Sequence, residues 1–250
     1  MTRYHTRMSL PVPRPLLRLT AKAVSDFAMI RPHDRVLVAV SGGKDSLSLL
    51  QVLQHMARNA PFPWTLGAAT IDPGIEGFDP APLIPYMEAQ GIPYFYERQA
   101  IAERAKASLG NDSFCSFCAR MRRGTLYRLA RDHDYNVLAL AQHLDDIAES
   151  FLMSAFHAGT LHTMRAHYRI DAGDLRVIRP FVYVRERQLR DFAKVADLPV
   201  IADNCPACFR KPTERAAMKA LLATEEARHK PLFANLLQAV RPLLGTRDIP

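Results

Sequence analysis

Apolar and polar positions along the chain follow two patterns in turn. Short, nearly continuous apolar runs are typical of strands buried in a parallel sheet. We expect such strands at residues 35–40, 64–72, 92–98, 136–143 and 175–184, and a short sixth strand at 199–204. Between them, apolar residues recur every three to four positions, which is typical of amphipathic helices. We expect these helices at 15–30, 46–59, 81–91, 100–108, 119–134, 144–159, 185–198 and 213–229.

The alternation of strands and helices predicts an α/β fold built on a doubly wound parallel sheet. The first and the last helix flank the alternating region, so we expect short helical extensions at the N- and C-terminal ends. The stretch 160–174 has neither pattern and predicts irregular structure.

The residues between the first strand and the next helix, SGGKDS at 41–46, have the composition of a phosphate-binding turn. A strand, a glycine-rich turn and a helix direct backbone N–H groups and the positive end of the helix dipole at an anion. The two glycines permit positive φ and a close approach, while Ser41, Lys44 and Ser46 add hydroxyl groups and a charge. The alternative, a plain turn with a serine N-cap, requires fewer glycines and donors. The loop lacks the Walker A pattern G-x-x-x-x-G-K-S/T.

Two carboxylates, Asp145 and Asp146, follow the fourth predicted strand. Because the carboxyl ends of parallel strands meet at one edge of a sheet, we expect them near the glycine-rich turn. Paired carboxylates there could hold Mg²⁺ on the phosphates, since this ion prefers hard oxygen ligands. Acidic residues also favour the first turn of a helix, and the two roles are compatible.

All four cysteines lie in two C-x-x-C pairs, Cys115 with Cys118 and Cys205 with Cys208. Since no cysteine is left over, one shared metal site is the favoured interpretation, against unligated thiols or transient redox disulfides. No secretory signal precedes the chain's first helix, so a disulfide framework is not expected. A tetrahedral zinc site and an iron–sulfur cluster both accept thiolates, and the spacing does not distinguish them.

The chain has 33 Lys and Arg against 25 Asp and Glu, a formal net charge of +8, which suits a polyanionic partner such as nucleic acid. The helix after the first cysteine pair is either a phosphate-binding or a solvated face. Its basic residues are Arg120, Arg122, Arg123, Arg128 and Arg131; Arg179, Arg185 and Arg187 raise the same question. No apolar run reaches about 18 residues, so we expect a cytoplasmic protein without a membrane span.

Taken together, these motifs resemble the tRNA 2-thiocytidine synthetase (TtcA-like) family of the PP-loop superfamily, the N-type ATP pyrophosphatases. SGGKDS is similar to their pyrophosphatase loop. Similar stretches are CSFCARMRRGTLYRLA, QHLDDIAESFLMSAFHAG and RVIRPFVYVRERQLRDFA, and the resemblance covers about residues 15 to 240. It implies an adenine nucleotide alpha hydrolase-like fold and ATP-dependent thiolation of tRNA. ATP would adenylate the C2 oxygen of an anticodon-loop cytidine, with release of pyrophosphate, and sulfur would then displace AMP.

The resemblance also implies roles for individual residues. The catalytic residues would be Lys44, Asp45, His143 and Asp145. ATP and Mg²⁺ would be bound by Ser41, Gly42, Gly43, Lys44, Asp45, Ser46, Ile71, Asp72 and Asp146. A [4Fe-4S] cluster would be held by Cys115, Cys118 and one cysteine of the second pair, Cys205 or Cys208, with Cys208 preferred. Where the family commonly has Gly-His-His, this chain has Ala141-Gln142-His143.

The implied partners are tRNA and a persulfide or other sulfur donor such as a cysteine desulfurase, and the implied assembly is a homodimer. We expect an N-terminal arm and first helix over 1–30, an ATP-binding domain with the first cysteine pair over 31–204, and a tail with the second pair over 205–250. Two alternatives stay open. One is a zinc-containing PP-loop enzyme that ligates or amidates another substrate, and the other is a non-catalytic, metal-stapled nucleotide- or RNA-binding module.

Overall fold

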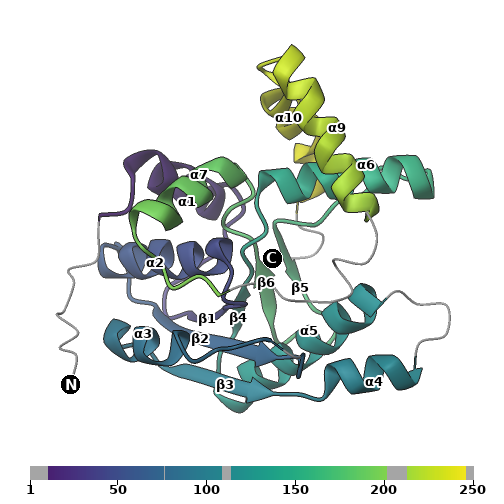
Figure 1. The fold of residues 1–250 in the computed structure, drawn as a ribbon. Helices are drawn as coiled ribbons and strands as arrows, with labels where there is room; N and C mark the ends of the chain where they lie inside the picture. The colour runs from purple at the N-terminus through teal and green to yellow at the C-terminus, as the bar shows by residue number, and fades with distance from the viewer. Residues whose placement is uncertain (1–10, 76, 109–113, 202–212, 246–250) are drawn as a thin grey trace.

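The protein folds around one six-stranded sheet with helices on both faces (Figure 1). The computed structural model describes residues 11–75, 77–108, 114–201 and 213–245, with backbone alone at 106–108 and 114–116. The strand order is β3-β2-β1-β4-β6-β5, and every pair is parallel except β5 with β6. The strands are β1 Arg35–Ala39, β2 Thr65–Asp72, β3 Tyr94–Arg98, β4 Val137–Ala139, β5 His167–Arg169 and β6 Arg176–Ile178.

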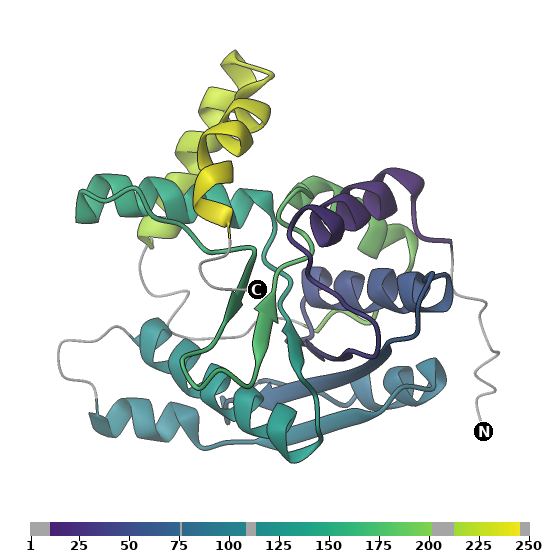
Figure 2. The same ribbon diagram turned by 180° about the vertical axis from the view of Figure 1, so that it is seen from behind.

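Nine helices are described, in three groups. One face of the sheet carries α1 Arg14–Asp26, α2 Lys44–Arg58, α3 Leu83–Gln90 and α7 Glu186–Val195. The other face carries α4 Ile101–Ser108 and α5 Phe114–Asp132. The third group is α6 Leu144–Ala158, α9 Glu214–Arg228 and α10 Leu232–Leu244, and Figure 2 shows α9 and α10 as a hairpin that rises from α6 away from the sheet.

The two faces of the sheet are filled by alternate residues of the same strands. In β1, Val36 and Val38 pack against α2, whereas Leu37 packs toward α5, and none of the three is exposed. Side chains of a strand point to opposite faces in turn, so a strand covered on both faces must be apolar throughout. This burial explains why continuous apolar runs predicted the central strands, and the predicted fold class is confirmed.

The sixth strand differs from the prediction. Residues 199–201 form no strand, and 202–204 lie outside the described part of the chain. The strand at the edge is instead β5, inside the stretch 160–174 that was predicted to be irregular. It has three residues and pairs antiparallel with β6 through a turn at Gly173. A short edge strand needs no apolar run, because only part of it is buried.

The end of the fifth predicted strand also differs from the prediction. The apolar run at 175–184 predicted a long strand, but β6 ends at Ile178 and the buried residues Phe181, Val182 and Val184 continue in a turn. Apolar runs report burial, and a buried turn gives the same pattern.

Helix α5 begins five residues earlier than predicted, so the first cysteine pair lies inside it. Helix α10, which contains Pro242, was not predicted.

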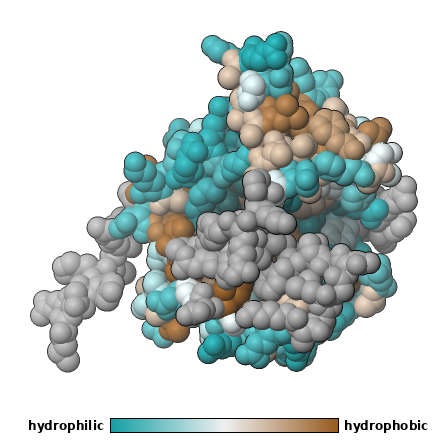
Figure 3. Space-filling view, turned by 45° about the vertical axis from the view of Figure 1, so that its right-hand side comes forward, coloured by the Kyte–Doolittle hydropathy of each residue, from teal (hydrophilic) through white to brown (hydrophobic). Residues whose placement is uncertain are grey.

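The hairpin leaves apolar side chains at the surface. Figure 3 shows brown apolar surface at the end of the molecule where α6, α9 and α10 meet. Among the exposed large apolar residues there are Phe156 of α6 and Leu221 of α9, with 59% and 39% of their surface exposed. Among the helices of the described residues, none combines the length and apolar character that crossing a membrane requires.

A buried ion pair joins the amino ends of three strands. Asp34, just before β1, accepts hydrogen bonds from Arg176 of β6 and from Nδ2 of Asn136, which precedes β4, the latter at 2.9 Å. Its other oxygen accepts from the amide of Arg31 at 2.7 Å. The carboxylate therefore fixes the sheet at the edge opposite the glycine-rich loop.

We predict that Asp34→Ala lowers the free energy of unfolding by about 3 kcal/mol, because it leaves the buried Arg176 without its counter-ion. Urea unfolding followed by circular dichroism measures the change. The control is Asp174→Ala, which removes an exposed ion pair with Arg131 and should leave the midpoint unchanged. Equal midpoints for the two variants would contradict the prediction.

Candidate active site

The SGGKDS loop joins the carboxyl end of β1 to the amino end of α2, as predicted. Gly43 is the N-cap of α2, and no side chain caps the helix, so the N–H groups of its first turn remain available to an anion. Inside the loop, Ser46 Oγ donates to the Gly43 carbonyl at 2.9 Å and accepts from the Ser41 amide at 3.2 Å. These bonds fix the loop around its hydroxyl groups before any ligand binds.

The two glycines of the loop have different reasons to be glycine. Gly42 has φ +88°, and a Cβ there would lie 2.2 Å from Cγ1 of Ile201. The amide of Ile201 also donates to the Gly42 carbonyl at 3.0 Å. Gly43 has φ −75°, so the predicted positive φ does not apply to it, and among the described residues a Cβ there would meet Ser41 Oγ at 3.5 Å. In the described part of the chain, neither the backbone nor the packing requires glycine at 43.

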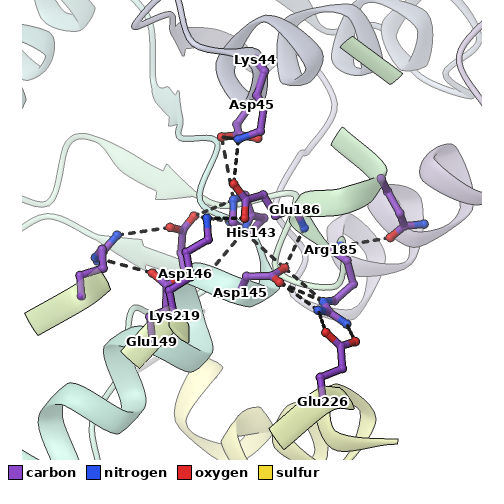
Figure 4. A network of polar contacts seen from close by, with 12 residues as sticks. Lys44, Asp45, His143, Asp145, Asp146, Glu149, Arg185, Glu186, Lys219 and Glu226 are labelled. Carbon is purple, nitrogen blue, oxygen red and sulfur yellow. Dashed lines mark hydrogen bonds and ion pairs between the residues drawn. The ribbon is translucent and has the colours of Figure 1, made fainter. Parts of the chain in front are cut away.

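Acidic and basic side chains alternate from the loop across the carboxyl edge of the sheet (Figure 4). This acid–base chain consists of Lys219, Glu186, Lys44, Asp45, His143, Asp146, Arg215 and Glu149. Its members come from α2, from the start of α6, from the first turn of α7 and from α9. Four segments that are distant in sequence therefore meet at the loop.

The first half of the acid–base chain surrounds Lys44. Its Nζ lies 3.0 Å from Asp45 Oδ2 and 3.0 Å from Glu186 Oε1, and Lys219 Nζ lies 2.6 Å from Glu186 Oε2. Burial lowers the pKa of Lys44, but the two carboxylates outweigh it and the pKa is raised. Burial works in the opposite sense on Glu186, yet the two lysines bring its pKa down to about 2. Lys44 and Glu186 are therefore both charged at neutral pH.

The second half of the acid–base chain surrounds His143. Nε2 of His143 lies 3.9 Å from Asp45 Oδ2 and 3.4 Å from Asp146 Oδ2. The same residue is the N-cap of α6: its amide donates to Asp146 Oδ2 at 3.0 Å, and its Nδ1 accepts from the Asp146 amide at 3.4 Å. Arg215 donates to the other oxygen of Asp146 at 3.2 Å, and its Nε lies 3.8 Å from Glu149. The cap thus holds Asp146 and the imidazole beside Asp45.

Asp45 has an unused coordination site. Its Oδ1 is buried and has no hydrogen-bond partner, while Oδ2 accepts from Lys44. Burial raises the pKa of Asp45, against the lowering effect of His143 and Lys44. A buried carboxylate oxygen without a partner is costly in a finished fold, so Oδ1 is a candidate position for a ligand or an ion. Hard cations prefer such oxygens.

Asp145 points in another direction from Asp146, although the two are neighbours (Figure 4). Its carboxylate accepts from Arg185 Nε and Nη2 at 3.0 to 3.2 Å and from the Glu186 amide at 2.7 Å. Arg185 also donates to both oxygens of Glu226 and lies 3.2 Å from the ring centroid of Phe233. Asp145 therefore fixes the start of α7 and, through Arg185, the hairpin of α9 and α10.

Two of the predicted ATP-binding residues, Ile71 and Asp72, lie at the end of β2. The side chain of Ile71 is buried in the core toward α5, so the backbone remains for ligand contact. The carbonyl of Ala69 accepts from Val40 on the β1 side, and hydrogen-bonding directions alternate along a strand. The backbone of Ile71 therefore faces the side where β1 has already ended. The carboxylate of Asp72 is engaged by the Tyr96 hydroxyl and the Gly74 amide.

The four cysteines are only partly described. Cys115 and Cys118 lie three residues apart in the first two turns of α5, which places them on the same face of that helix. Cys118 is half-buried. The side chain of Cys115 and all of Cys205 and Cys208 lie outside the described part of the chain. Among described side chains, no group of three or more His, Cys, Asp or Glu residues is arranged to hold a metal ion.

The basic residues of α5 divide into two sets. At the far end of the helix, Arg128 pairs with Glu97 and Asp132, and Arg131 pairs with Asp174. These two arginines serve the fold. The three arginines nearer the cysteines, at 120, 122 and 123, occupy exposed or half-buried positions. A polyanion contact at these three arginines stays a prediction.

Gln142 has a structural partner in this chain. Its Oε1 accepts from Nε of Arg179 at 2.9 Å, and Arg179 also donates to the Arg165 carbonyl at 2.6 Å. Arg179 is buried, and its burial lowers its pKa. This arginine therefore ties the ends of β4 and β6 together and is not a surface contact for a partner.

Several site residues were not predicted from the sequence. They are Glu149, Glu186, Arg215 and Lys219. Burial, then the neighbouring Asp146, raises the pKa of Glu149 to about 7. The helix at 213–229 was predicted, but its sequence gave one signal that it belongs to the site: Arg215 and Lys219 are four residues apart and lie on one helix face. That spacing is common on solvated helices, so it did not indicate the site.

The fold and the loop define a class of protein. A parallel sheet with an SGGKDS loop after its first strand is a PP-loop domain, and residues 15–223 match the family described as the PP-loop domain. The tRNA-cytidine(32) 2-sulfurtransferase of Geobacter sulfurreducens is 42% identical over 221 residues, which are 88% of this chain and 86% of the relative. The protein of the same name from Methylococcus capsulatus is 39% identical and covers 86% of this chain and 74% of its own length. The chain belongs to the tRNA 2-thiocytidine synthetase (TtcA-like) family, as its motifs predicted.

A solved structure is similar in fold. The U34-tRNA thiolase NcsA of Methanococcus maripaludis, determined with its [4Fe-4S] cluster, superimposes with a TM-score of 0.74 over 92% of this chain and 78% of that chain. At 21% sequence identity, this similarity supports the fold alone.

We predict that Arg185→Gln loosens the hairpin of α9 and α10, because Asp145 and Glu226 lose their shared cation. The free energy needed to open the hairpin should fall by about 2 kcal/mol. Amide exchange in 214–244 should therefore become about 30-fold faster. Hydrogen exchange with mass spectrometry measures it. The control is Arg187→Gln, which removes an exposed arginine 3.7 Å from the same Glu226. Equal protection in both variants would mean that Arg185 does not hold the hairpin.

A second prediction concerns Glu149, whose pKa is about 7 against an ordinary 4.5. The native protein keeps a proton that the unfolded chain loses, so this group lowers the free energy of unfolding as pH rises from 4.5 to 7 and no further above 7. Glu149→Gln has no proton to lose, so it should unfold with a higher free energy than the unmodified chain, by about 3 kcal/mol at pH 8 and by little at pH 5. Urea unfolding at several pH values measures the difference between the variant and the unmodified chain. A difference that does not depend on pH would refute the prediction.

Proposed function

We propose that the protein is an ATP-dependent tRNA sulfurtransferase that forms 2-thiocytidine in the anticodon loop. The observation that carries the proposal is the loop itself: a helix start whose N-cap is a glycine, a Gly43 that no described neighbour requires to be glycine, and the unpaired Oδ1 of Asp45. Relatives about 40% identical over most of the chain are named tRNA-cytidine(32) 2-sulfurtransferases, which supports the substrate.

The loop would hold the β- and γ-phosphates of ATP. Backbone N–H groups of the first turn of α2 and the hydroxyl of Ser41 donate to phosphate oxygens, and Lys44 adds a positive charge. The adenine would lie at the end of β2 against the backbone of Ile71. This arrangement leaves the α-phosphate between the loop and the start of α6, where an acceptor oxygen could approach it.

The chemistry has two steps. The C2 oxygen of the cytidine attacks the α-phosphorus, the bond to the bridging oxygen of the β-phosphate breaks, and pyrophosphate leaves with the electron pair. A ring carbonyl oxygen is a poor leaving group, but as part of AMP it leaves readily when hydrosulfide attacks C2. A persulfide donor supplies hydrosulfide only when a thiol reductant provides two electrons. His143 would position Asp45 and Asp146 on either side of the reacting phosphate, since its imidazole lies between their carboxylates.

Asp45 and Asp146 fit a magnesium ion better than the Asp145–Asp146 pair does. Oδ1 of Asp45 is unpaired, and Asp146 is the member of the pair that faces the loop. The oxygens of both Asp145 and Asp146 are engaged, but Asp145 is held by Arg185, which is 12% exposed, whereas Oδ1 of Asp146 is held by Arg215, which is 48% exposed. Bound Mg²⁺ would neutralise charge on the phosphates. Asp145 would contribute by positioning the first turns of α6 and α7.

The four cysteines are the donor set for the sulfur carrier. Thiolates are the ligands that iron–sulfur clusters require, and Cys115 and Cys118 share one face at the start of α5. A [4Fe-4S] cluster held by these two and by Cys208 or Cys205 would supply sulfur to C2 when loaded. Since α5 runs back toward the start of β4, its first turn lies at the carboxyl edge of the sheet, the edge of the ATP loop. Arg120, Arg122 and Arg123 would contact the tRNA backbone beside it.

The first measurement is metal and acid-labile sulfide on protein purified without oxygen. About four iron and four sulfide per chain, with broad absorption near 400 nm, are expected of a cubane cluster. One zinc and no sulfide would remove the sulfur-carrier mechanism and favour a zinc-containing PP-loop ligase. Nucleotide binding without AMP release would favour a non-catalytic module.

The test of the ATP site is Asp45→Asn, assayed with unmodified tRNA, ATP and a persulfide donor, with 2-thiocytidine quantified by mass spectrometry. We expect thiolation to fall at least about 100-fold, because the carboxylate that faces the phosphates is lost. The matched control is Asp79→Asn, a change at an exposed aspartate that accepts from the Ala81 amide, and it should leave thiolation unchanged. Undiminished activity of Asp45→Asn would exclude the proposed role.

A further inference from the structure

Helix α9 places two cations at the proposed phosphate site. Arg215 and Lys219 lie four residues apart, one turn of helix, and therefore on one face of α9. Arg215 donates to Asp146 at 3.2 Å, and Lys219 donates to Glu186 at 2.6 Å. Both carboxylates belong to the site already described, since Asp146 faces His143 and Glu186 pairs with Lys44.

The charges around the loop compensate one another. Three cations, Lys44, Lys219 and Arg215, contact the carboxylates of Asp45, Glu186 and Asp146, and Arg215 also lies 3.8 Å from Glu149. A metal-bound triphosphate brings both signs, because its metal needs carboxylate oxygens and its phosphates need cations. Such a ligand can offer its metal to Asp45 and Asp146 and its phosphates to the cations.

The two α9 cations are not needed to dock their helix. Docking is provided by Arg185, which is 12% exposed and pairs with Glu226 of α9, and by apolar contacts of Leu222 and Phe233 with α6. The side chains of Arg215 and Lys219 are 48% and 57% exposed, so their ion pairs add little to stability. Half-exposed side chains of this length have room to change partners.

We propose that Arg215 and Lys219 are phosphate ligands that exchange partners when nucleotide binds. They leave Asp146 and Glu186 and donate to the β- and γ-phosphate oxygens of ATP, and they stay on the pyrophosphate that is released. Arg215 presents a planar fork to a phosphate, whereas Lys219 presents a point charge. The freed oxygen of Asp146 turns to the metal. This inference rests on the proposed ATP-dependent function and adds α9 to the walls of its phosphate site.

The test measures equilibrium binding by titration calorimetry, with Mg²⁺ and the α,β-methylene analogue of ATP, in the absence of tRNA. For Arg215→Gln and for Lys219→Gln we expect the dissociation constant of the analogue to rise about tenfold or more, since each removes a charge-assisted hydrogen bond. The dissociation constant of AMP, which lacks the β- and γ-phosphates, should stay within about twofold. The control is Arg228→Gln on the same helix, which pairs with Glu225 at the surface and should bind both ligands normally.

Each outcome decides between the two proposals. If the unmodified chain binds the analogue and both variants bind it equally well, the partner exchange is wrong and the ATP site stands. An equal loss of affinity for AMP and for the analogue would also overturn it, because α9 would then act only by positioning the site. If the unmodified chain does not bind the analogue at all, the proposed function fails and this inference fails with it.

Discussion

The organisation of the site depends on one partly buried guanidinium. Arg185 lies against the ring of Phe233 and binds the carboxylates of Asp145 and Glu226, so the first turns of α6 and α7 and the hairpin of α9 and α10 meet at one side chain. An arginine satisfies two carboxylates in this way because its planar fork offers five donors. The members of the acid–base chain take their places from these three elements and from the loop after β1.

This arrangement separates the tasks of two adjacent aspartates. Asp145 is committed to Arg185 and the start of α7, which frees Asp146 to close the cap of α6 and to face Asp45. Neither orientation follows from the sequence Asp-Asp. It follows from the helix, because consecutive residues of a first turn point about 100° apart and therefore toward different neighbours.

The sequence predicted those parts of the protein that local physics determines. The central strands are apolar because they are covered on both faces, and SGGKDS is recognisable because glycines, hydroxyls and a lysine are concentrated in six residues. Glu186 and Lys219 lie 142 and 175 residues after Lys44 in the sequence. Nothing in the loop sequence predicts that they lie near Lys44, because contacts between such distant residues depend on how the helices pack. The edge strand β5 was not predicted for a local reason. It has three residues, and only the first is buried, so its sequence has almost no apolar pattern.

The contacts of Arg185 bear on how this chain can be divided. By sequence, the last 46 residues look like a tail added to a complete nucleotide-binding domain, 205–250 after 31–204. In physical terms the border runs through the middle of an ion-pair network, because Glu226 of the hairpin pairs with Arg185, while Lys219 and Arg215 contact Glu186 and Asp146 of the preceding domain. The hairpin is thus an integral wall and not an interchangeable module. Substitutions on its outer surface or longer loops would leave these contacts intact. Replacement of the whole hairpin would require matching changes in the loop after β1 and in the first turns of α6 and α7.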